Sequence, residues 1–167
     1  MKTKHRTNAF FICKSAIIAA MYVVLTWISA SFGLSGGIVQ FRISEALCGL
    51  AVFTPAAIPG MTVGCVVSGL VTGAEIWDVV FGSLATLAGI TGTRLLRKNV
   101  WVAPAAYFAA NTVAVPFILQ YVYGSEGTLL FFFLTVGAGE AVCAYGGGVL
   151  LAKLAEKSQI SGLLTEK

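Results

Sequence analysis

The fold is decided by the run SAIIAAMYVVLTWISASFGL, which occupies residues 15–34 and contains no charged side chain. A transmembrane helix needs about 20 predominantly apolar residues, because each residue advances the helix by about 1.5 Å across a hydrocarbon core of about 30 Å. A basic stretch before the run and the small residues Ser29-Ala30-Ser31 imitate a secretory signal. Signal peptides have a shorter apolar core, however, of about 7–15 residues. We therefore expect an uncleaved first membrane span.

The composition extends this expectation to the whole chain. Among 167 residues, 57% are hydrophobic and 11% are charged, and the mean hydropathy is +0.88. Soluble domains carry about 25% charged residues, so this chain is too apolar to be one. Further apolar runs predict spans at about 44–58, 60–74, 78–94, 103–122 and 128–152. The predicted fold is an all-α membrane protein, a bundle of six transmembrane helices over residues 15–152 between tails at 1–14 and 153–167.

The basic residues predict the orientation of this bundle. Cytoplasmic loops of membrane proteins carry an excess of lysine and arginine. Of the 11 basic residues, those on one side of the predicted membrane are Lys2, Lys4, Arg6, Lys14, Arg94, Arg97, Lys98, Lys153, Lys157 and Lys167. The other side holds only Arg42. Both termini are therefore expected in the cytoplasm, and Arg42 is the exception on the outer side.

Several function classes are excluded by motifs that the sequence lacks. Because no GxxxxGK[ST] phosphate loop is present, we do not expect the chain to hydrolyse ATP itself. No HExxH motif occurs, and the single histidine, His5, lies in the basic tail, which leaves no basis for a histidine triad or metal site. The four cysteines form no CxxC pair. We expect no enzyme activity, no cofactor, no metal and no nucleic-acid partner.

Two polar residues lie deep inside the predicted spans. Glu140 lies about a dozen residues into the last span, about 18 Å along a helix, and has glycine neighbours. A carboxyl group is costly at that depth, so it faces either a ligand cavity or a neighbouring helix to which it hydrogen-bonds. Asn111 lies at a comparable depth in the fifth span, where its amide can bond Glu140, another helix or a heterocyclic ligand.

A short polar run, Gln40-Phe41-Arg42-Ile43-Ser44-Glu45, precedes the second span. A guanidinium and a carboxylate three positions apart, beside an amide and an aromatic ring, can bind a flat polar molecule. The alternative is structural. Ser44 is a typical N-cap and Glu45 in the first turn suits the helix dipole, so that Arg42 pairs with Glu45 or a lipid phosphate.

The fourth span begins with two residues, Trp77 and Asp78, that also allow both a structural and a ligand-binding interpretation. A tryptophan at the membrane interface and an acid in a first helical turn are ordinary features. The same two side chains can also contact a ligand that enters from the outer side. Both interpretations remain open from the sequence.

Small residues four positions apart occur in two spans. Gly60 and Gly64 lie in the third span, and Ala16 and Ala20 lie in the cytoplasmic half of the first. Such pairs let helix backbones approach closely within a membrane. They serve either packing inside the bundle or docking of a partner protein.

The stretch Val39-Gln40-Phe41-Arg42-Ile43-Ser44-Glu45-Ala46-Leu47 resembles the signature of the QueT family of queuosine-precursor transporters. These are substrate-binding S components of energy-coupling factor (ECF) transporters. The resemblance covers most of residues 15–152 and continues through Pro55-Ala56-Ala57-Ile58-Pro59-Gly60, Gly64-Cys65, Trp77-Asp78, Gly82, Ala85-Thr86 and the glycine-rich setting of Glu140.

The resemblance implies an architecture and a set of partners. It implies six helices in the cell membrane, cytoplasmic termini and an outward-facing substrate site. It also implies partnership with a transmembrane coupling protein and two ATPase subunits. In such systems small residues on the first helix dock the coupling protein, and Ala16 and Ala20 match that role.

The implied substrate is a 7-deazaguanine queuosine precursor such as preQ0 or preQ1. Its guanine-like edge offers adjacent N–H donors to a carboxylate, its carbonyl needs a donor, and its ring can stack on an aromatic side chain. The matching residues are Glu140 or Glu45 for the donors, Asn111 or Arg42 for the carbonyl, and Phe41 or Trp77 for the ring. Heterocycles without those donors would leave buried polar groups unpaired, which is expensive.

Three hypotheses from different classes therefore follow from the sequence. The first is a membrane substrate-binding subunit of an ATP-driven importer, for a 7-deazaguanine or for another vitamin or heterocycle. The second is a stand-alone carrier coupled to protons through Glu140. The third is a membrane scaffold whose polar residues serve packing alone.

Overall fold

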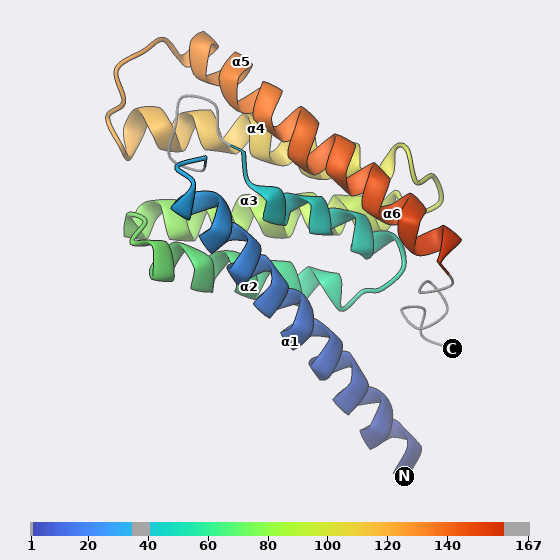
Figure 1. Cartoon of the computed structure of the whole chain (residues 1–167). Helices are drawn as coiled ribbons and strands as arrows, with labels where there is room; N and C mark the ends of the chain where they lie inside the picture. Colours follow the sequence, from blue (N-terminus) through green and yellow to red (C-terminus); the bar gives the residue numbers. More distant parts are fainter. Residues whose placement is uncertain (1, 35–40, 159–167) are drawn as a thin grey trace.

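The computed structural model describes residues 2–34 and 41–158, with side chains from residue 8 onward, so Gln40 lies outside the described residues. The described chain is entirely helical outside its turns and loops (Figure 1). Its helices are α1 (Lys2–Ser31), η1 (Ile43–Val52), α2 (Ala57–Thr72), α3 (Ile76–Leu95), α4 (Ala103–Tyr121), α5 (Leu129–Glu140), η2 (Ala141–Gly146) and α6 (Gly147–Lys157). The last three elements follow one another without a break and form one long helix.

Each predicted span overlaps a helix, and the last span covers α5, η2 and part of α6. Within the described residues, three helices are long and apolar enough to cross a membrane: Asn8–Ser31, Ile76–Leu95 and Leu129–Lys157. Two further apolar helices, Ile43–Val52 and Ala57–Thr72, are shorter. The helical prediction is thus confirmed, and the crossing of the shorter segments and of α4 stays a prediction.

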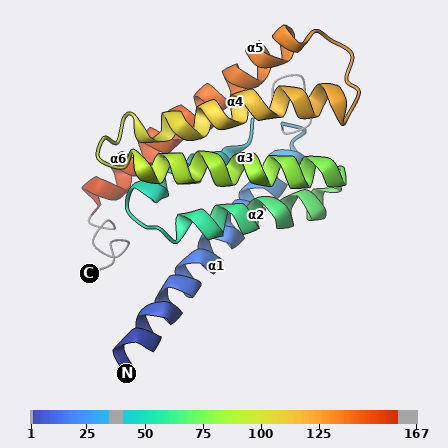
Figure 2. The same cartoon turned by 180° about the vertical axis from the view of Figure 1, so that it is seen from behind.

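The helices α2, α3 and α4 lie side by side, with α1 crossing obliquely and the long α5–α6 helix running along the other side (Figures 1 and 2). The beginning of α1 extends past the other helices. In both views the start of α1 and the end of α6 lie toward one end of the molecule, and the α2–α3 and α4–α5 connections lie toward the other. We refer to this second end as the outer end, following the predicted orientation.

Close helix contacts explain the glycine pattern. A Cβ atom on Gly60 would come within 2.8 Å of the Ser15 carbonyl oxygen, and one on Gly64 within 2.7 Å of the Tyr22 Cβ. The predicted packing role of this glycine pair is therefore confirmed, and its partner is α1. A closer approach joins η1 to α6, where a Cβ on Gly49 would overlap the Gly148 carbonyl oxygen.

The second span differs from the expected α-helix. Its residues 43–52 form a 3₁₀-helix, η1, which is long for this type because 3₁₀ runs beyond about 3–4 residues are uncommon. Arg94 stabilises the end of η1, since its Nη1 donates to the carbonyl oxygens of Ala51 at 3.0 Å and Val52 at 2.9 Å. These bonds satisfy carbonyls that a helix end leaves without intrahelical donors.

Candidate functional site

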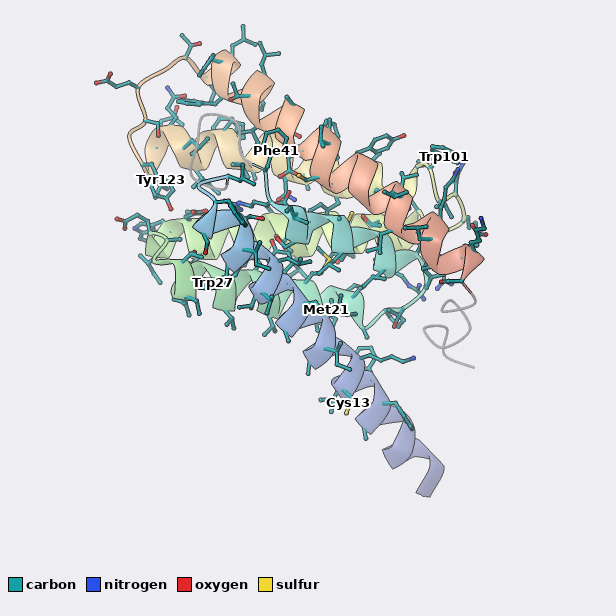
Figure 3. All side chains as sticks on the ribbon, viewed as in Figure 1. Cys13, Met21, Trp27, Phe41, Trp101 and Tyr123 are labelled. Carbon is teal, nitrogen blue, oxygen red and sulfur yellow. The ribbon has the colours of Figure 1, made fainter. Side chains whose placement is uncertain are left out.

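A cavity of about 240 Å³ opens at the outer end, between α1, α2 and the start of α3. Polar groups line much of it: Tyr22, Thr26, Arg42, Ser68, Thr72, Asp78 and Tyr123. Figure 3 shows Tyr123 at this end of the molecule and Trp101 near the opposite end, with Phe41 between them. Small-molecule pockets usually have volumes of about 300–1,000 Å³, so this one suits a small ligand.

Arg42 connects the cavity to a buried carboxyl group. It lies at the start of η1 with extended backbone, lines the cavity, and places its Nη1 4.0 Å from Oε1 of Glu45. Glu45 occupies the first turn of η1, as predicted, and is only 3% exposed. The pair therefore lies between the cavity and the interior of the bundle.

The prediction that Ser44 caps this helix is wrong. Arg42 occupies the N-cap position, and no side chain caps η1 there. The Ser44 hydroxyl accepts a hydrogen bond from Thr26 Oγ1 at 2.7 Å, across to α1. Ser29, also on α1, accepts from the backbone N–H of Ile43 at 3.2 Å. The start of η1 is thus held by the hydroxyl groups of α1, which fixes the position of Arg42.

Glu140 reaches the same region from the long carboxy-terminal helix. It is the last residue of α5, is 5% exposed, and precedes the π-helical turn η2. The turn that follows it packs against η1, the helix that carries Glu45, but neither glutamate lines the cavity itself. The Oε2 oxygen of Glu140 has no hydrogen-bond partner in the described structure. Short π-helical turns inside α-helices occur frequently at functional sites.

Asn111 is the third deeply buried candidate. Its side chain lies on the buried face of α4, is 3% exposed, and its Nδ2 finds no partner among the described residues. One turn below it, the Tyr107 hydroxyl lies 3.4 Å from Thr86 Oγ1 on α3. Buried polar atoms are normally hydrogen-bonded, so an unpaired amide and an unpaired carboxyl oxygen are unusual.

Asp78 and Trp77 are neighbours in the sequence, but their side chains have different surroundings. Asp78 lines the cavity and accepts a hydrogen bond from the Tyr123 hydroxyl at 2.7 Å. That hydroxyl also accepts from the backbone N–H of Glu75 at 3.3 Å. Burial and the bond to Asp78 raise the pKa of Tyr123 to about 12. Trp77 is 58% exposed, stacks on Phe81 at a centroid distance of 6.1 Å, and does not line the cavity.

The remaining predicted residues do not line the cavity. Phe41 is half-buried beside Arg42, and its backbone N–H donates to the Leu34 carbonyl. Ala16 and Ala20 do not line the cavity and are exposed on α1. Within the described residues, no group of three or more His, Cys, Asp or Glu side chains is placed to hold a metal ion.

Sequence reasoning missed the contribution of α1 to the site. Tyr22 and Thr26 both line the cavity, and both are buried. They lie four residues apart, so they share one face of the helix. Two polar side chains at helical spacing inside an apolar run were the signal that could have identified them. Tyr123 carried no comparable signal, because aromatic residues are common near membrane interfaces.

Comparison with known proteins shows the family of this chain. Residues 12–157 match the family described as QueT transporter. The chain belongs to the QueT transporter family. It is 27% identical to the queuosine precursor transporter QueT of Lactococcus lactis subsp. cremoris (strain MG1363), over 93% of this chain and 98% of that protein. No solved structure matches the chain. As a QueT family member with long apolar helices, it is a multi-pass membrane protein.

Proposed function

We propose that this protein is the membrane substrate-binding subunit for uptake of a 7-deazaguanine queuosine precursor such as preQ0 or preQ1. The observation that carries the proposal is the outer cavity lined by Arg42, whose guanidinium lies 4.0 Å from the buried carboxyl group of Glu45. The QueT family match and the name of the Lactococcus lactis relative support the substrate class. The small cavity volume, about 240 Å³, favours a compact bicyclic base over a larger vitamin.

The roles follow from hydrogen-bond chemistry. A carboxylate accepts two parallel N–H bonds, so Glu140, whose Oε2 is unpaired, accepts the adjacent donors of the guanine-like edge. The carbonyl of the base takes a hydrogen bond from Arg42 or from the free Nδ2 of Asn111. Glu45 holds Arg42 in place, and Asp78 contacts the outer part of the ligand. Phe41 stacks on the ring, a role for which exposed Trp77 is poorly placed. Gln40 belongs to the same proposed site.

Energy for transport comes from other subunits in this proposal, because the sequence contains no phosphate loop. An ECF transmembrane coupling protein docks on the exposed face of α1 that carries Ala16 and Ala20, and it recruits two ATPase subunits. All six helical segments cross the membrane, both termini are cytoplasmic, and the cavity opens outward. The basic residues of the tails and of the α3–α4 connection support this orientation.

Calorimetric titration of the purified protein with preQ0 tests the assigned recognition. Glu140→Gln replaces one acceptor oxygen by an NH2 group, and removal of a hydrogen bond to a charged group costs about 1.5–3 kcal/mol. We expect the dissociation constant to rise by about tenfold to 150-fold. Glu126→Gln, at an exposed loop position, is the matched control and should bind as the native protein does. Unchanged affinity of Glu140→Gln would remove Glu140 from the site.

Binding of another heterocycle is the alternative within the same class. Native mass spectrometry of the protein with its co-purified ligand separates the two. An adduct with the mass of a 7-deazaguanine supports the proposal. An adduct of the size of thiamin or riboflavin would assign the chain to a different substrate.

A further inference from the structure

The charged side chains in the wall of the outer cavity do not balance. Arg42 and Asp78 both line the cavity. The guanidinium of Arg42 lies 4.0 Å from the carboxyl group of Glu45, which does not line the cavity itself. Among the described residues, no lysine or arginine forms an ion pair with Asp78. Arg42 thus has an acidic partner and Asp78 has no basic one, so the cavity can accept one further positive charge.

The surroundings of Asp78 hold its carboxyl group in place and leave it open to a ligand. Asp78 lies in the first turn of α3 and is half-buried. Its Oδ2 accepts a hydrogen bond from the Tyr123 hydroxyl at 2.7 Å, and that hydroxyl accepts from the backbone N–H of Glu75 at 3.3 Å. A carboxylate has about four acceptor sites, so one bond from a phenol leaves most of this capacity unused. Tyr123, in the α4–α5 connection, therefore orients the acid at the outer end of the cavity.

The shape of a 7-deazaguanine carries its variable group to this position. The N–H edge belongs to the six-membered ring, and the substituent at position 7 lies on the five-membered ring, at the other end of the molecule. When the N–H edge faces the buried carboxyl groups, the substituent faces the outer end, where Asp78 and Tyr123 meet. In preQ1 this substituent is an aminomethyl group, which is a cation at neutral pH, as a lysine side chain is. In preQ0 it is an uncharged nitrile with the same number of non-hydrogen atoms.

We propose that Asp78 binds a primary ammonium group of the ligand, and that the protein therefore prefers preQ1 to preQ0. The inference rests on the proposed function, because it requires the guanine-like edge to be bound on the inner side. The ammonium group donates to the unused acceptor sites of Asp78 and supplies the positive charge that the cavity lacks. The nitrile has neither a donor nor a charge, so it would displace water from the carboxylate without replacing the lost hydrogen bonds.

Calorimetric titration of the purified protein with preQ1 and with preQ0, at one pH and one salt concentration, tests this preference. Because charge-assisted hydrogen bonds are the strong ones, the native protein should bind preQ1 about tenfold more tightly than preQ0. Asp78→Asn keeps an oxygen that accepts from Tyr123 but removes the charge, so preQ1 affinity should fall about tenfold and preQ0 affinity should not fall. Glu126→Gln removes one negative charge from an exposed position in the α4–α5 connection and should keep the native preference.

The use of two ligands separates a direct contact from a structural role of Asp78. An acid in a first helical turn also suits the helix dipole. If Asp78 has only this role, Asp78→Asn should weaken the binding of preQ0 and preQ1 equally, and the ammonium site would be overturned. Equal affinity of the native protein for both ligands, or tighter binding of preQ0, would also overturn it and leave the proposed function standing. Absence of binding of either ligand would overturn both.

Discussion

At the scale of single residues, the proposed site depends on polar side chains that are buried inside the bundle. Arg42 satisfies Glu45, but Glu140 Oε2 and Asn111 Nδ2 have no partner in the described structure. An unpaired buried polar group costs about 1–3 kcal/mol. A ligand that pairs both atoms recovers this free energy, and a ligand that pairs neither recovers none. We therefore expect the unpaired atoms to contribute to both affinity and selectivity in the proposed site.

Tyr22 gives a residue-scale prediction. Its buried side chain lines the cavity, whereas Tyr107, an equally buried tyrosine, is outside the cavity lining and places its hydroxyl 3.4 Å from Thr86 Oγ1. Because a typical hydrogen bond is worth about 1 kcal/mol, Tyr22→Phe should weaken preQ0 binding about fivefold. Tyr107→Phe is the matched control and should retain native affinity. Equal losses in the two variants, measured by calorimetry, would mean that Tyr22 acts only through packing.

Much of the site could be predicted from residue type and depth. Glu140 and Asn111 were identified because an acid or amide inside an apolar span needs a partner, and both are buried as expected. The role of Ser44 could not be derived in this way. Its capping assignment relied on local preference, and the structure uses the hydroxyl for a bond to Thr26, eighteen positions away. A tertiary contact of this kind cannot be predicted from the local sequence pattern.

At the scale of elements, two departures from α-helical geometry meet beside the buried carboxyl groups. The 3₁₀-helix η1 carries Glu45, and the π-turn η2 begins directly after Glu140. Cys48 of η1 donates to the Ala144 carbonyl of η2 at 3.3 Å. The apolar runs identified both segments as helical, but an apolar run does not distinguish among 3₁₀, α and π winding. The difference is set by packing between elements that are far apart in the sequence.

The approach of η1 to α6 yields an element-scale prediction. A methyl group at position 49 would overlap the Gly148 carbonyl oxygen, whereas one at position 137 would only touch Thr112 Cγ2 at 3.4 Å. Gly49→Ala should therefore destabilise the bundle by about 1–3 kcal/mol through overpacking. Gly137→Ala should be neutral or slightly stabilising, because alanine favours helices. Thermal unfolding in detergent measures both, and an unchanged melting temperature of Gly49→Ala would contradict the close contact.

At the scale of the whole molecule, the orientation of the bundle determines where the cavity opens. Composition and the distribution of charge predicted six helical segments, and the structure contains a helix in each predicted range. Their arrangement around a cavity was not derivable, because periodicity gives the buried face of a helix but not its neighbour. The outward orientation rests on the basic residues.

The cysteines provide a direct test of this orientation. Cys13 is exposed, near the start of the first apolar run, whereas Cys48, Cys65 and Cys143 are buried. A membrane-impermeant maleimide should label Cys13 in inside-out vesicles and leave it unlabelled in intact cells. In a Cys13→Ser background, Ser125→Cys in the α4–α5 connection should show the opposite pattern. Labelling of Cys13 from outside would reverse the orientation.

Uptake by reconstituted vesicles tests the central claim most directly. The protein is placed in liposomes alone or together with an ECF coupling protein and its ATPases, and the entry of labelled preQ0 is measured with internal or external ATP or with a pH gradient. The account predicts ATP-dependent uptake only when the partner subunits are present, and binding without net transport when they are absent. Uptake by the protein alone, driven by a pH gradient, would contradict it and identify a proton-coupled carrier.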